Sequence, residues 1–168
     1  MAEALNLAII VVALLALFYL LKGRPKAAPP VQHPRAGSYT PVPEGAPVLH
    51  WSDGGGQFDV EVLGESRYRD TIRRLAGAHG DGQADARHTA LLLPDDANPY
   101  EDKAVAVFLS GEMVGYLAPK DALAFRQRLA RQEIAGQLTS CDAAVRGGAL
   151  WEGKRLAYAV WLDLDLKG

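Results

Sequence analysis

The chain has 168 residues, which is room for one ordinary domain with accessory segments. Its 18 Lys and Arg nearly balance its 20 Asp and Glu, so the overall charge does not indicate a polyanionic partner. The single cysteine, Cys141, excludes a disulfide framework and a cysteine-rich zinc site. A lone thiol of this kind is expected to be a small buried apolar group.

The N-terminal segment predicts a membrane helix. Residues 5–21 are apolar apart from Asn6 near the outer end, and at about 1.5 Å per residue they span roughly 26 Å. The alternative, a cleaved signal peptide, would begin with positive charge, whereas this chain begins MAEALN. The nearest basic residues, Lys22, Arg24 and Lys26, all follow the helix. We therefore expect residues 1–4 outside a bacterial inner membrane and the rest of the chain in the cytoplasm.

A linker is expected at residues 22–56. Seven of the ten prolines lie there without apolar periodicity, which is typical of a semi-extended tether. Val48–Trp51 is an apolar patch that can dock on the following domain. Asp53–Gly56 contains three glycines, but no Lys-Ser or Lys-Thr pair follows, so it is interpreted as a flexible joint rather than a phosphate loop.

Residues 57–168 show the pattern of one α+β domain that is mainly β. Alternating apolar and polar residues predict strands, and apolar residues three or four apart predict helices. Tyr68, Ile72 and Leu75 form such a helical stripe, with Ser66 as the expected N-cap. The expected elements are a strand at 58–62, a helix from 66, a loop at 76–86, a strand at 89–94, two strands within 103–118, a helix from 119, and strands near 142–145 and 156–166.

Short turns between most of these strands predict an antiparallel sheet that curls into a small barrel with two short helices. Ser110-Gly111 is the expected tight turn of a hairpin, and Pro119 suits the first turn of the second helix. That helix has an inward stripe of Ala122, Phe125 and Leu129. In the last strand one face is expected to lie on the core; its residues are Leu156, Tyr158, Val160, Leu162, Leu164 and Leu166.

No recognised motif for catalysis or metal binding is present in the sequence. The four histidines have no metal-ligand spacing with one another or with Cys141, and there is no nucleophile elbow or Walker loop. A Cys–His or Ser–His pair that forms only in the folded chain stays open. We therefore expect a protein that is not an enzyme and that holds no cofactor or metal.

One segment resembles a known family. Residues 97–122, ANPYEDKAVAVFLSGEMVGYLAPKDA, are similar to the signature of the HIRAN domain family, in which an Asn-Pro-Tyr-Asp turn precedes an apolar strand, a hairpin and a Gly-Tyr-Leu-Pro segment before a helix. Upstream, residues 62–72, VLGESRYRDTI, resemble the first strand and short helix of that family. The resemblance covers about 58–166 and implies an OB-like barrel with two helices.

The resemblance also implies a function, the capture of the 3′-hydroxyl end of single-stranded DNA or of another nucleic-acid end. Transferred by position, Arg67 would meet a phosphate, and Tyr68 and Tyr100 would sandwich the terminal base. Asn98 would shape the turn, and Glu101 would accept a hydrogen bond from the hydroxyl. Two further candidate nucleic-acid-binding residues are Lys120 and Trp151. A helicase or a nuclease is the kind of protein partner that the resemblance suggests.

Each of these residues also has a structural interpretation. Asn98 can simply bond the backbone of its own turn, Tyr100 can cover the core, and the arginines from Arg67 to Arg74 can form a solvated helix face. Residues 57–168 carry 14 Lys and Arg against 17 Asp and Glu, a net charge of −3, whereas nucleic-acid binding generally relies on a basic surface. The alternative function is therefore a protein-interaction module at the membrane face.

Overall fold

The computed structural model of the protein describes residues 39–64 and 66–166. These residues belong to one compact unit. The predicted membrane helix at residues 5–21 lies outside the described residues. Within the part of the chain that is described, no helix is long and apolar enough to cross a membrane.

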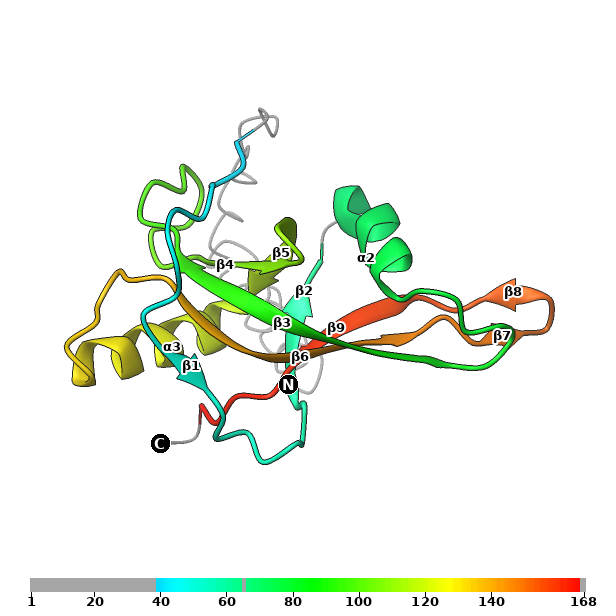
Figure 1. Ribbon diagram of the computed structural model, residues 1–168. Coiled ribbons are helices and arrows are strands. Elements are labelled where there is room, and N and C mark those ends of the chain that lie inside the picture. The colour runs from blue at the N-terminus through cyan, green and yellow to red at the C-terminus, as the bar shows by residue number, and fades with distance from the viewer. Residues whose placement is uncertain (1–38, 65, 167–168) are drawn as a thin grey trace, which may run out of the picture. The chain divides into compact units, whose positions relative to one another are not determined.

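Six antiparallel strands form a closed barrel. They pair in the order β6, β3, β4, β5, β2 and β9, and β9 pairs with β6 again to complete the ring (Figure 1). The interior is filled by alternate apolar residues, such as Val60 and Val62, whose neighbour Glu61 points to solvent. The predicted mainly-β barrel is confirmed. Its strands are β2 (Val60–Leu63), β3 (Ala84–Pro94), β4 (Val105–Leu109), β5 (Glu112–Leu117), β6 (Thr139–Gly147) and β9 (Tyr158–Leu162).

Two helices accompany the barrel, α2 (Arg69–Leu75) and α3 (Pro119–Arg131). In α3 the predicted stripe of Ala122, Phe125 and Leu129 is buried, and Pro119 opens the helix as expected. The predicted N-cap at Ser66 is wrong, because Ser66–Tyr68 form a short 3₁₀ turn, η1, and α2 begins only after it. Tyr68 and Ile72 are nevertheless buried along the predicted helical stripe.

The β4–β5 hairpin turns at Ser110 and Gly111, as predicted. Both residues have positive φ, 51° and 81°, which fits the tight turns that match the twist of antiparallel strands. Gly115 lies further along β5 with φ 151°, where β2 crosses close by. A Cβ at this position would lie 2.4 Å from the Leu63 carbonyl oxygen, so only glycine lets the two strands approach.

Residues 39–56, here named the N-terminal strap, contact the rest of the domain at several points, among them Tyr39 and Val48. Within the strap, β1 (His50–Trp51) pairs in parallel with β6 at Ser140 and Cys141. The Trp51 ring is buried between Phe125, whose ring centroid is 6.2 Å away, and the Arg128 guanidinium at 3.9 Å. The prediction that Val48–Trp51 docks on the domain is confirmed. Beyond β1, the Gly56 N–H donates to the Asp163 carboxylate, and this bond holds the glycine run of Asp53–Gly56 in place.

Several boundaries differ from the sequence-based expectation. The last strand, β9, covers only Tyr158–Leu162 of the expected 156–166, and β6 is longer than the expected 142–145. Phe58 has φ 50° and stands before β2 rather than inside it, with Arg87 over its ring. β3 begins at Ala84, so residues 84–86 are strand and not loop. Leu156 was expected on the buried face of the last strand, but it is 50% exposed. It lies at the base of a short projecting hairpin, β7 (Leu150–Trp151) with β8 (Lys154–Arg155), and β9 begins only after it, at Tyr158 (Figure 1).

Candidate functional site

The loop between β3 and β4, residues 95–104, is here named the Asn98 loop. The Asn98 side chain organises it, because its Oδ1 accepts the backbone N–H of Tyr100 at 2.9 Å and of Glu101 at 3.2 Å. This is an Asx turn, the local bonding that favours asparagine in turns. Glu101 adds a second bond, since its Oε1 accepts the Lys103 N–H at 3.1 Å. The tip of the loop therefore has a defined shape.

A buried carboxylate lies at the base of this loop. Asp95 is 3% exposed and accepts three side-chain hydrogen bonds, from the Tyr39 hydroxyl at 2.6 Å, from Asn98 Nδ2 at 3.1 Å and from the Tyr116 hydroxyl at 3.3 Å. These four residues are here named the Asp95 cluster. They come from the strap, the loop and β5, so the cluster joins three separate parts of the chain.

The helix α3 anchors the other side of the loop. The Arg126 guanidinium donates to the carbonyl oxygens of Lys103 and Ala104, at 2.9 and 2.8 Å, and to the Asp96 carboxylate at 2.7 Å. The Arg126 side chain is only 16% exposed, so these bonds are shielded from water more than an ordinary surface pair is. Together with the Asp95 cluster they fix both ends of the Asn98 loop.

Arg67 and Tyr68 adjoin the Asp95 cluster through Tyr116. The Arg67 guanidinium donates to the Tyr68 hydroxyl, and this hydroxyl donates to Met113 Sδ at 3.1 Å. Burial raises the pKa of Tyr116, and the charges of Asp95 and Tyr68 raise it further, while Arg67 acts in the opposite direction. Arg67 and Tyr68 thus lie near Tyr116, which shares the Asp95 carboxylate with Asn98.

The predicted stacking residues differ in exposure. Tyr100 is 41% exposed at the tip of the Asn98 loop, and Glu101 beside it is also exposed. Tyr68 is 7% exposed, with the Arg67 guanidinium 4.7 Å from its ring centroid. Tyr100 therefore offers an open aromatic face, while Tyr68 is a packed residue that supports Arg67.

The two remaining candidates, Lys120 and Trp151, lie in different places. Lys120 is exposed in the first turn of α3, the helix that also carries Arg126. Trp151 is 66% exposed on β7, which follows the Gly147 end of β6, whereas the Asn98 loop follows Pro94 at the opposite end of the β3–β6 pair (Figure 1). The structure therefore does not bring Trp151 together with the Asn98 loop.

Three residues of the site were not anticipated from the sequence: Asp95, Tyr39 and Arg126. Asp95 is one of two adjacent acids, and nothing in the sequence says which of them is buried. Tyr39 stands in a proline-rich stretch that was interpreted as linker. Arg126 follows the buried Phe125 directly in α3. This helical position indicated only weakly that the Arg126 side chain lies against the domain rather than in open solvent.

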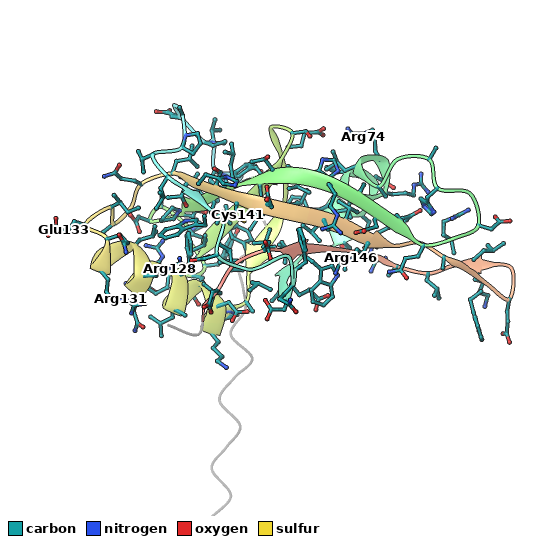
Figure 2. All side chains as sticks on the ribbon, turned by 60° about the horizontal axis from the view of Figure 1, so that its bottom comes forward. Arg74, Arg128, Arg131, Glu133, Cys141 and Arg146 are labelled. Atoms are coloured by element: carbon teal, nitrogen blue, oxygen red, sulfur yellow. The ribbon has the colours of Figure 1, made fainter. Side chains whose placement is uncertain are left out.

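Cys141 has no reactive character in this structure. It is fully buried in β6, in the interior of the barrel (Figure 2). Burial raises the pKa of its thiol, and the carboxylates of Asp142, Asp163 and Asp53 raise it further, so the thiol stays protonated. Among residues 39–64 and 66–166, no three His, Cys, Asp or Glu side chains gather as metal ligands.

Comparisons with protein-family models, with curated proteins and with solved structures found no match for this chain.

Alkaline pH is expected to weaken the Asp95 cluster through Tyr39. The bond to Asp95 raises the pKa of Tyr39 from 10.0 to about 12, so the folded state holds this proton more tightly than the unfolded state does. The stabilisation is complete below pH 10 and is lost as the pH rises to about 12. Between pH 10 and pH 12, the free energy of unfolding measured with denaturant should fall less in Tyr39→Phe than in the parent chain. Equal declines would mean that the Tyr39–Asp95 bond does not form in solution.

Proposed function

We propose that the domain is a HIRAN-like module with an OB-like barrel, which binds the 3′ ends of single-stranded DNA at the Asn98 loop. In the same proposal residues 5–21 anchor the chain in the inner membrane and the domain faces the cytoplasm. The protein has no catalysis of its own and works beside a helicase or a nuclease.

The observation that supports the proposal is the neighbourhood of Tyr116. Its hydroxyl and the Asn98 amide both bond Asp95, and Arg67 and Tyr68 lie near enough to affect its pKa. The residues that resemble the two family segments, 62–72 and 97–122, lie side by side although they are distant in sequence, because β2 pairs with β5 at Leu63 and Tyr116. A constellation of this kind is what a site built from both segments requires.

The exposed groups suit a strand end. Tyr100 supplies an aromatic face, and stacking of a base on such a face is worth about 1–3 kcal/mol whatever the base. Glu101 would accept a hydrogen bond from a terminal hydroxyl. A carboxylate repels a continuing phosphodiester chain, so it is tolerated only where the strand ends. Arg67 would contact the nearest phosphate, and Lys120 is available to a more distant one.

The test is fluorescence anisotropy of the full chain with two short DNA strands that differ only at the 3′ end, one a hydroxyl and the other a phosphate. The hydroxyl strand should bind about tenfold more tightly, because Glu101 repels the added dianion. Tyr100→Ala should weaken binding by about 1–3 kcal/mol. Glu101→Gln should reduce the preference for hydroxyl, and Arg67→Ala should weaken both strands and lower the salt dependence by about one charge.

Matched variants act as controls. Trp151→Ala removes an exposed aromatic ring at the other end of the barrel, so it should leave binding unchanged. Asp102→Asn removes an exposed acid beside Glu101 that pairs with Lys103, and it should change the preference for hydroxyl less than Glu101→Gln does. Weak, equal binding of the two strands, unaffected by Tyr100→Ala or Glu101→Gln, would refute the nucleic-acid proposal. It would leave the second candidate, a protein-interaction module, which the net charge of the domain and its exposed leucines favour.

A further inference from the structure

A groove of about 600 Å³ lies between α2 and the strands β2 and β9. It forms where β2 ends at Leu63 and the chain turns away through Gly64 to α2, while β9 continues alongside β6. Two leucines of the lining are unusually open to solvent, Leu63 at 51% and Leu156 at 50%. Ile72 of α2 adds a buried apolar side chain to the lining. The groove is of the size that binds ligands in proteins.

The backbone of β9 has an open edge in this groove. Leu162 and Val160 pair with Val60 and Val62 of β2, but no residue of β2 pairs with Tyr158. The backbone bonds of Ala157 and Asp163 point toward the β6 side of the strand. Because backbone groups alternate in direction along a strand, the N–H and C=O of Tyr158 point into the groove, where β2 would have continued. Unpaired groups of this kind are a template for another strand.

The α2 side of the groove is basic. Arg69 and Arg73 stand four residues apart, so they share one face of the helix, and both line the groove. Neither makes an ion pair or hydrogen bond with the described residues. Two acids, Glu61 and Asp70, also belong to the lining. The third arginine there, Arg155, donates to the carbonyl oxygens of Gly80 and Gly148, which directs its charge elsewhere.

We propose that this groove binds an extended peptide of a partner protein by strand addition to β9. The peptide lies beside β9, in the position that β2 would occupy if it continued past Leu63, and it exchanges backbone hydrogen bonds with Tyr158. One of its side chains is apolar and fits between Leu63 and Leu156, and an acidic neighbour reaches Arg69 and Arg73. Pairing by backbone with selection by alternate side chains is a general mode of peptide recognition. The proposal does not depend on nucleic-acid binding at the Asn98 loop.

The probe is a fluorescent peptide of about eight residues in which Val and Glu alternate, tested on the full chain by anisotropy. Two matched peptides separate the contributions. In one, Lys replaces Glu, and in the other, alternate backbone nitrogens carry methyl groups that block strand pairing. The Val/Glu peptide should bind saturably, the Lys peptide about fivefold or more weakly, and the methylated peptide not measurably. Amide exchange at Tyr158 should slow when the Val/Glu peptide is bound.

Arg73→Glu should weaken binding of the Val/Glu peptide about fivefold or more. Its matched control is Arg131→Glu, because Arg131 is also an exposed arginine in the last turn of a helix, on α3 and away from α2 (Figure 2). Tyr100→Ala should have no effect on the peptide, which distinguishes this site from the Asn98 loop.

Three results would overturn the proposal. They are absence of saturable binding of the Val/Glu peptide up to about 1 mM, equal binding of the methylated peptide, and displacement of the peptide by short single-stranded DNA. The last would assign the groove to nucleic acid.

Discussion

Replacing Trp51 with alanine is expected to lower the free energy of unfolding by about 3–5 kcal/mol. The ring is 6% exposed and packs edge-on against Phe125 with the Arg128 guanidinium over its face, so its removal leaves a cavity under the strap. The indole N–H has no hydrogen-bond partner among the described residues, so the loss comes from packing and the cation–π contact. Urea unfolding followed by circular dichroism measures the change.

Trp151→Ala is the matched control, because the same residue type is there 66% exposed. It should change the free energy of unfolding by no more than about 0.5 kcal/mol. A loss below about 1 kcal/mol for Trp51→Ala would contradict the structure, since it would mean that the strap contributes no packed core.

Replacing Asp95 with alanine is expected to cost about 2–4 kcal/mol of stability. The substitution leaves three donors without their acceptor, the hydroxyls of Tyr39 and Tyr116 and the amide of Asn98, in a place where Asp95 itself is 3% exposed. The Asn98 loop should also lose its fixed shape. Faster amide exchange at Tyr100 and Glu101 would report this, because both N–H groups bond to Asn98.

The neighbouring acid provides the comparison. Asp96 has a side chain 70% exposed and one ion pair, with Arg126, so Asp96→Ala should cost no more than about 1 kcal/mol. Asp95→Asn keeps one acceptor oxygen, so its cost in stability should fall between those of the other two variants. Its amide nitrogen is a donor and would face another donor in the place of the second oxygen. Similar losses for Asp95→Ala and Asp96→Ala would refute the special role of Asp95.

The barrel was predictable because its strands carry strong local patterns. Val60 and Val62 alternate with polar residues, and Ser110-Gly111 marks its turn without long-range information. The elements that were missed depend on distant partners. β1 is two residues long and exists only because β6 lies beside it. Leu156 is exposed at the base of the β7–β8 hairpin, outside β9.

The site was predictable in part for the same reason. Asn98 organises its own turn, so its role follows from residues two and three positions on. The Asp95 cluster needs Tyr39 and Tyr116, which only the folded chain brings to the loop. The groove beside β9 also lacks a sequence signal, because it results from a strand that stops and leaves its neighbour unpaired.

The pairing of β1 with β6 also determines how late in synthesis the N-terminal strap can fold. His50 and Ser140 are 90 residues apart, and a ribosome that adds about 5–20 residues per second needs roughly 5–20 s to pass from one to the other. Throughout that interval Trp51 cannot pair with β6. The barrel also stays open, because Val60 pairs with Leu162, which is synthesised later still. The nascent chain therefore carries exposed apolar surface until β9 is made, whereas a domain built from local contacts would bury its surface earlier.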